Sequence, residues 1–105
     1  MSSGAGRFPH PYLWAYGVSK AGICFLAETA AEELGPLGIR VNAVAPGEIE
    51  TAMLSPETET LIPLIPQRRL GKPDEVAATI FYLCSPDSSY VTGTEIFITG
   101  GQHLF

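Results

Sequence analysis

A tyrosine and a lysine stand four positions apart in this sequence, at Tyr16 and Lys20. On an α-helix, side chains at that spacing lie over the same face, so the phenol and the ammonium can act as a unit. A neighbouring cation favours the phenolate, and it therefore lowers the pKa of a tyrosine toward working pH. Such a tyrosine is suited to general acid/base catalysis. Because both residue types are common on helices, the pair becomes specific only through the motifs around it.

Further motifs flank this pair along the whole chain. They are Ser3 within Ser2 to Gly6 (S-S-G-A-G), Tyr16 to Gly22 (Y-G-V-S-K-A-G), Arg40 to Gly47 (R-V-N-A-V-A-P-G), Pro46 to Thr51 (P-G-x-I-x-T), Arg69 to Ala77 (R-L-G-K-P-D-E-V-A) and Tyr90 to Gly93 (Y-V-T-G). In this order, they resemble the compact, single-domain branch of the short-chain dehydrogenase/reductase family. One departure is Thr99, which stands where the family usually has an aspartate.

The resemblance implies a catalytic triad of Ser3, Tyr16 and Lys20. In that triad Tyr16 donates or accepts the proton, Ser3 holds the substrate oxygen, and Lys20 tunes the tyrosine. Hydride then passes between a nicotinamide and a carbonyl or secondary-alcohol carbon. Substrate contacts are expected from Ser3, from Trp14 and from Met53.

The resemblance also implies a set of residues that bind the cofactor, which is NAD or NADP. Backbone groups of Pro46, Gly47 and Ile49 are expected to flank the nicotinamide carboxamide, and the Thr51 hydroxyl to reach the cofactor. Lys20 is expected to hydrogen-bond the nicotinamide ribose. The full set is Tyr16, Lys20, Pro46, Gly47, Ile49 and Thr51.

No glycine-rich loop of the form G-x-x-x-G-x-G or G-x-G-x-x-G occurs in the 105 residues. Dinucleotide binding relies on such a loop to seat the pyrophosphate at a helix N-terminus. The predicted fold class is therefore α/β, the C-terminal part of a Rossmann-like doubly wound parallel sheet with the N-terminal cofactor half missing. Residues 1–105 are interpreted as the catalytic half of one domain.

The proline-free segment 13–34 predicts the helix that carries the catalytic pair, with a stop at Gly35 and Pro36. Its middle, Ala21 to Ala27, is apolar nearly all the way round, so one face is expected on the sheet and another on a partner helix. Because the family commonly assembles through this helix, the resemblance implies a homodimer or homotetramer.

The remaining elements alternate between strand and helix. Ile39 to Ala45 predicts a buried parallel strand, and Thr94 to Thr99 predicts a second strand. Between them, residues 48–72 are interpreted as an apolar loop that serves as a substrate lid, because prolines interrupt the apolar residues. A second helix is expected from Pro73 to the stop at Ser85-Pro86-Asp87.

Composition excludes several classes of protein. The chain is 46% hydrophobic and 16% charged, without an apolar run approaching the roughly 20 residues of a membrane span. The net charge of -5 argues against nucleic-acid binding. The N-terminus lacks the layout of a signal peptide, so a cytoplasmic location is expected. Cys24 and Cys84 have no ligand spacing, which predicts buried structural thiols and no metal site.

Two functions remain open from the sequence. The first is the oxidoreductase just described, acting on a small carbonyl or alcohol substrate. The second is a truncated, non-enzymatic fragment that retains only helix-mediated association. An isomerase or dehydratase of the family's extended branch is disfavoured, because those chains have a longer C-terminal substrate domain.

Overall fold

The computed structural model describes residues 14–51 and 56–102. Helices and strands alternate along this part of the chain, with short 3₁₀ turns between some of them. The elements are α1 (Trp14–Leu34), β1 (Ala43–Pro46), α2 (Pro56–Leu61), α3 (Pro73–Leu83) and β2 (Glu95–Ile98). The predicted α/β class is confirmed.

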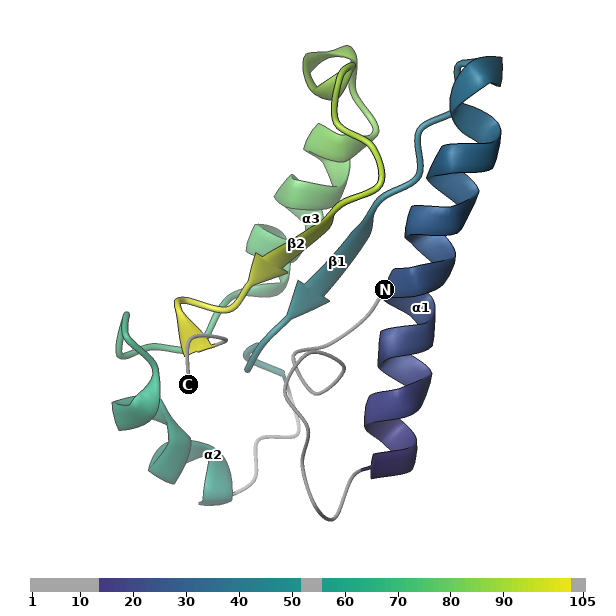
Figure 1. Cartoon of the computed structure of the whole chain (residues 1–105). Helices are drawn as coiled ribbons and strands as arrows, with labels where there is room; N and C mark the ends of the chain where they lie inside the picture. Colours follow the sequence, from purple (N-terminus) through teal and green to yellow (C-terminus); the bar gives the residue numbers. More distant parts are fainter. Residues whose placement is uncertain (1–13, 52–55, 103–105) are drawn as a thin grey trace.

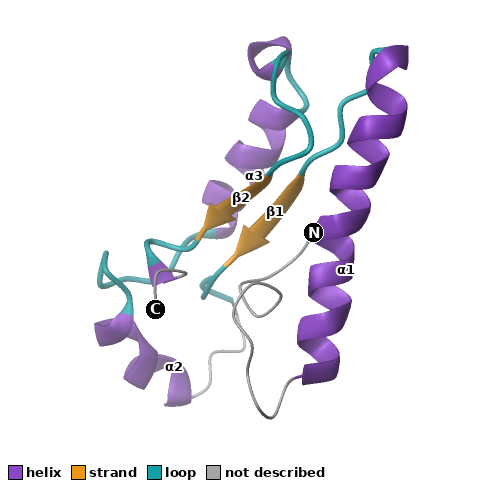
Figure 2. Ribbon diagram, in the orientation of Figure 1, coloured by secondary structure: helices purple, strands orange, loops and turns teal. Residues whose placement is uncertain are grey.

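Strands β1 and β2 form a parallel two-stranded sheet, in which Ala43 pairs with Glu95 and Pro46 with Ile98. The sheet lies between α1 and α3, as Figures 1 and 2 show. Both strands run toward the end of the molecule at which α1 begins (Figure 1). The start of α1 and the carboxyl ends of the strands therefore share one end of the fold.

Helix α1 ends at Leu34, one residue before the predicted stop at Gly35. A 3₁₀ turn follows, and Gly38 adopts a left-handed conformation with φ 77° while its N–H donates to the Gly35 carbonyl. Ala27 and Ala31 are buried, and α1 contacts β1. The small alanine side chains allow the helix to lie close to the sheet.

The opposite side of α1 is open in this chain. Phe25 and Leu26 are 69% and 66% exposed, respectively. The predicted division of this helix into a sheet-facing side and a second apolar side agrees with the structure. No described element of the chain covers that second side.

The first strand is shorter at its start than predicted, because regular pairing begins at Ala43 rather than Ile39. Before Ala43, one backbone bond joins the two segments, from the Gly93 N–H to the Val41 carbonyl at 2.8 Å, and side chains make further bonds. The Thr92 hydroxyl accepts from the Val41 N–H at 3.0 Å. The Asn42 side chain donates to the Val91 carbonyl and accepts from the Thr94 N–H. These bonds continue the contact between the two segments without continuing the ladder.

The segment 48–72 is not the irregular loop that was expected. Helix α2 and a 3₁₀ turn at Ile62–Leu64 occupy its middle, and Ile65 is 1% exposed. Pro56 is the first residue of α2, where the missing N–H of a proline costs nothing. Proline thus starts a helix here instead of preventing one. The role of this segment as a substrate lid stays a prediction.

Helix α3 begins at Pro73 as predicted, but its apolar side chains are exposed in this chain. Phe81 is 77% exposed and Ile80 is 38% exposed. The prediction of buried thiols is wrong for Cys84, which is exposed, and Cys24 is only partly buried. The physical reason is that Ile80 and Cys84 line an open pocket beside residues 40–44 instead of packing closely against them.

Candidate functional site

The predicted catalytic helix places Tyr16 and Lys20 within its first two turns. At 3.6 residues per turn they share a face of α1, close to the end where the strands finish (Figure 1). Trp14 is the first residue of the same helix. The side chains of these three residues, and Ser3 and Met53 altogether, lie outside the described residues.

The turn that follows β1 is tied to the end of β2. The Gly47 N–H donates to the Ile98 carbonyl at 3.0 Å. The next N–H, that of Glu48, donates to the Gln102 side-chain carbonyl at 3.2 Å. Pro46 and Gly47 are half-buried. These two bonds hold the first part of the predicted nicotinamide-facing turn against the sheet.

The same turn is tied on its other side to the residues that precede α3. Ile49 forms a parallel bridge with Gly71. The Glu48 carbonyl accepts from the Gly71 N–H at 3.0 Å, and the Glu50 N–H donates to the Gly71 carbonyl at 2.8 Å. Thr51, at the end of this run, is exposed. The backbone from Gly47 to Glu50 is therefore held from two directions.

Gly47 is required by space rather than by backbone conformation, because its φ is not positive. A Cβ at this position would lie 2.8 Å from Gln102 Oε1 and 3.1 Å from the Cα of Thr99. Any side chain at this position would push the turn away from the residue that follows β2, Thr99. The glycine of the P-G-x-I-x-T motif thus allows the turn to approach the sheet.

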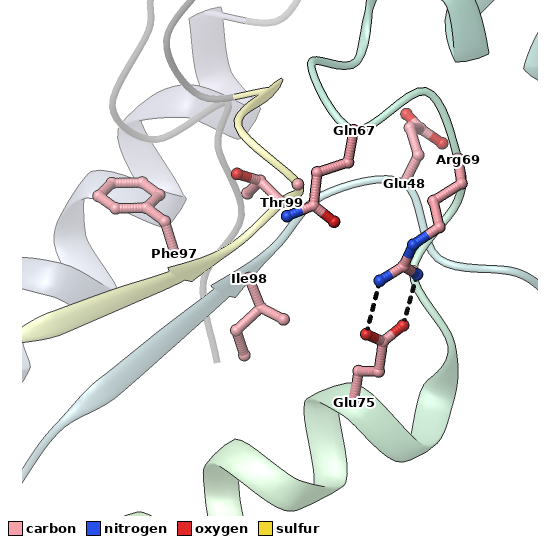
Figure 3. Close-up of a pocket in the computed structure, with 9 residues that line it drawn as sticks. Glu48, Gln67, Arg69, Glu75, Phe97, Ile98 and Thr99 are labelled. Carbon is pink, nitrogen blue, oxygen red and sulfur yellow. Dashed lines mark hydrogen bonds and ion pairs between the residues drawn. The ribbon is translucent and has the colours of Figure 1, made fainter.

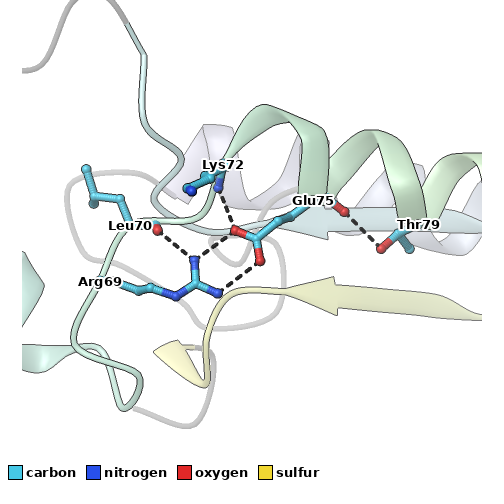
Figure 4. A network of polar contacts seen from close by, with 5 residues as sticks. All are labelled: Arg69, Leu70, Lys72, Glu75 and Thr79. Carbon is cyan, nitrogen blue, oxygen red and sulfur yellow. Dashed lines mark hydrogen bonds and ion pairs between the residues drawn. The ribbon is translucent and has the colours of Figure 1, made fainter.

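An ion pair organises the start of α3. The two terminal guanidinium nitrogens of Arg69, Nη1 and Nη2, donate to the Glu75 carboxylate at 2.8 and 2.9 Å (Figure 4). Glu75 also accepts from the Lys72 N–H at 2.9 Å. The hydrogen bonds from Arg69 and then from Lys72 lower the pKa of Glu75 from 4.5 to about 2. The pair raises the pKa of Arg69.

Three basic residues, Arg68, Arg69 and Lys72, precede α3 closely in the sequence. Arg69 is paired with Glu75, and Arg68 donates to the Ile65 carbonyl at 2.9 Å. Both cations hold the loop that carries Gly71, and Gly71 in turn holds the turn after β1. Their role in this structure is support of the local fold.

A small cavity of about 220 Å³ opens beside the turn, at the carboxyl end of β2. Figure 3 shows Arg69 and Glu75 on one side of it and Thr99 near the end of the strand. The polar residues and the two glycines around it are Glu48, Gln67, Arg69, Gly71, Glu75, Thr99 and Gly100. Thr99, at the position of the family's aspartate, is 9% exposed, and its hydroxyl accepts from the Gly101 N–H at 3.3 Å.

Two parts of this arrangement were not assigned from the sequence. The pairing of Arg69 with Glu75 could have been predicted from the sequence, because these opposite charges flank Pro73 within a recognised motif. The contact of Gln102 with Glu48 could not have been predicted, because the two residues are 54 positions apart in the sequence. Within the described ranges there is no group of three residues that could hold a metal ion, and no helix long and apolar enough to cross a membrane.

Comparison with known proteins gives close matches over nearly the entire chain. The family described as enoyl-(acyl carrier protein) reductase matches residues 1–103. Protein FixR of Bradyrhizobium diazoefficiens is 54% identical over 106 residues, which cover 99% of this chain and 38% of that protein. The 3-oxoacyl-(acyl-carrier-protein) reductase FabG of Thermotoga maritima is 50% identical over 105 residues, covering 96% of this chain and 43% of that protein.

The fold has equally close neighbours among solved structures. A crystal structure of a short chain dehydrogenase from Bacillus anthracis matches with a TM-score of 0.92 and 38% identity, covering 100% of this chain and 43% of that chain. The match confirms the predicted fold class, part of a Rossmann-like parallel sheet. The chain spans between 38% and 43% of the length of these three proteins.

Proposed function

We propose that this chain, which belongs to the short-chain dehydrogenase/reductase family, supplies the proton-transfer part of an oxidoreductase. The reaction is hydride transfer between NAD or NADP and a carbonyl or secondary-alcohol carbon. The relatives support oxidoreductase chemistry in general, and the assignment to this chain rests on the arrangement of its own elements.

One observation carries the proposal. The first turns of α1, with Tyr16 and Lys20 on one face, begin at the end of the molecule where β1 and β2 finish (Figure 1). In open α/β sheets, ligands bind beyond the carboxyl ends of the strands. The candidate acid/base pair and the Pro46 to Ile49 turn thus belong to the same end of the fold.

In this mechanism Tyr16 transfers the proton to or from the substrate oxygen. Lys20, one helical turn away, stabilises the phenolate form of the tyrosine. The Ser3 hydroxyl donates a hydrogen bond to the same oxygen and steadies the charge that develops there. Trp14 and Met53 contact the substrate.

The turn after β1 fits a nicotinamide because its backbone is held rigidly. Gly47 and Glu48 are bonded to the β2 side, and Glu48 and Glu50 to Gly71. A turn held in this way presents its backbone groups in fixed positions, which is what recognition of a planar carboxamide requires. Pro46, Gly47 and Ile49 are assigned to the carboxamide, and Thr51 to a hydroxyl contact. The cofactor, when bound, supplies or accepts the hydride.

The test is the substitution Tyr16→Phe in the full-length protein. Turnover is expected to fall by at least about a hundredfold, the lower end of what a positioned acid/base contributes. Tyr90→Phe is the matched control, because Tyr90 is fully exposed and distant from the turn after β1. The first substrate to use is a 3-oxoacyl thioester with NADH or NADPH, after the class named for the Thermotoga relative. Turnover of Tyr16→Phe near the unsubstituted rate would refute the mechanism.

A second candidate function is association without catalysis, through α1. It is favoured by the exposure of Phe25 and Leu26 on this helix. Burying two such side chains contributes several kcal/mol to an interface, because each large apolar side chain contributes about 1.5–3 kcal/mol. The homodimer or homotetramer proposed for the enzyme would use the same surface, so association by itself does not separate the two functions.

Nicotinamide binding separates them. The 105 residues contain no glycine-rich pyrophosphate loop, so the chain alone is expected to bind NADH no more tightly than millimolar. The full-length protein is expected to bind it in the micromolar range. Titration followed by nicotinamide fluorescence measures both. Saturable binding by the isolated chain below about 10 μM would contradict the expected need for that loop, whereas a full-length protein that binds no nicotinamide would favour pure association.

A further inference from the structure

Gln102 lies four residues beyond β2, and its side chain returns to the end of β1. Its backbone N–H donates to the Thr99 carbonyl at 3.1 Å, which closes a turn. Its side-chain carbonyl then accepts from the Glu48 N–H at 3.2 Å, a bond that joins residues 54 positions apart. The side chain of a residue after the last strand thereby completes the hydrogen bonding of the turn after the first.

The backbone that directs Gln102 to this place is unusual. Gly100 and Gly101 both have positive φ values, 62° and 95°. A Cβ on Gly101 would also lie 2.7 Å from Pro66 Cγ. Glycine adopts such angles with the least strain, and any side chain at position 101 would clash with Pro66. The turn that aims Gln102 at Glu48 is thus determined by both conformation and space.

The contact is close as well as polar. The position of a Gly47 Cβ would be 2.8 Å from Gln102 Oε1, so the amide oxygen occupies the space that a side chain would need. Gln102 is half-buried in this arrangement. The lack of a side chain at Gly47 therefore leaves room for the Gln102 amide oxygen.

We propose that Gln102 is a positioning residue of the candidate site, whose side-chain carbonyl fixes the Gly47-Glu48 turn and so sets the backbone that faces the nicotinamide. The inference rests on the proposed function for its effect on cofactor binding. Without this bond, the turn keeps on its β2 side, among the described residues, only the bond from the Gly47 N–H to the Ile98 carbonyl. The backbone that receives the cofactor would then sample more than one position.

The experiment compares three variants. Gln102→Met has the same length but no amide oxygen, and Gln102→Glu restores an acceptor. Gln67→Met makes the same chemical change at an exposed glutamine that lines the small cavity beside the turn, and it is the matched control. Melting temperatures of all three show whether the fold is retained.

The first measurement is amide hydrogen exchange in the 105-residue chain by NMR. In Gln102→Met, exchange of the Glu48 amide is expected to rise about fivefold, the factor that corresponds to one ordinary hydrogen bond. The reference is the Gly93 amide, which bonds the Val41 carbonyl at the other end of the strands and reports global opening. A ratio of Glu48 to Gly93 exchange that stays at the unsubstituted value would overturn the proposal.

The second measurement is steady-state kinetics of the full-length protein. Gln102→Met is expected to raise the KM for the nicotinamide cofactor about fivefold to tenfold, with the KM for the carbonyl substrate unchanged and with rescue by Gln102→Glu. An equal fall in kcat for Gln102→Met and Gln67→Met, without a change in cofactor KM, would reduce Gln102 to a structural role and overturn the proposal. Absence of oxidoreductase activity in the unsubstituted protein would instead refute the proposed function, and this inference with it.

Discussion

Replacement of Gly47 by alanine tests whether the turn after β1 is packed as tightly as the structure indicates. The new methyl group would lie 2.8 Å from Gln102 Oε1 and 3.1 Å from the Cα and Cβ of Thr99. The glutamine can swing away, at the loss of its bond to the Glu48 N–H. Thr99 cannot move alone, because it is 9% exposed and follows β2 directly.

The expected cost follows from these two contacts. Overpacking of a well-packed site costs typically about 1–3 kcal/mol. Loss of the hydrogen bond adds about 1 kcal/mol. We therefore expect Gly47→Ala to lower the free energy of unfolding by about 2–4 kcal/mol, which corresponds to a fall of roughly 10 °C or more in Tm for a chain of this size.

Gly22→Ala is the matched control for this substitution. Gly22 lies within α1, and a Cβ there would have nothing within 4 Å. Because alanine is favoured over glycine in a helix, we expect the control to raise the free energy of unfolding by about 0.8 kcal/mol. Urea denaturation followed by circular dichroism measures both changes, with the m-value checked for constancy. If Gly47→Ala is as stable as the unsubstituted chain, the close approach of the turn to β2 is wrong.

Two further predictions concern the ion pair and the open side of α1. The pKa of Glu75 is lowered to about 2 in the folded chain, so its contribution to stability is complete above its unfolded value near 4.5 and is lost as the pH falls toward 2; Glu75→Gln should remove this component from acid unfolding curves, and an unchanged pH profile would count against it. Phe25, which is 69% exposed, should support self-association. Phe25→Asp should therefore shift sedimentation toward the monomer whereas Tyr90→Asp should not, and an oligomer that persists in Phe25→Asp would rule out this surface.

Much of the fold could be predicted because its signals are local. The proline-free run before Gly35 predicted α1, and Pro73 with the acidic residues after it predicted the start of α3. Alternation of short apolar runs with these helices predicted the parallel sheet. Local signals failed where a partner far along the chain intervenes. Asn42 and Thr92 bond the facing segment through their side chains just before Ala43, where regular pairing begins, and no run of apolar residues reveals this.

The candidate site divides in the same way. The amino-acid sequence alone determined the spacing of Tyr16 and Lys20, the P-G-x-I-x-T turn and the resemblance that relates them, since these depend on residues close together in the chain. Tertiary structure alone decided that the turn is held by Gln102 on one side and by Gly71 on the other. The Gln102 contact arises because the parallel strands bring their carboxyl ends together, which places residues 54 positions apart within hydrogen-bonding distance. Hydrogen bonds across such separations follow from packing, and packing is a property of the folded chain.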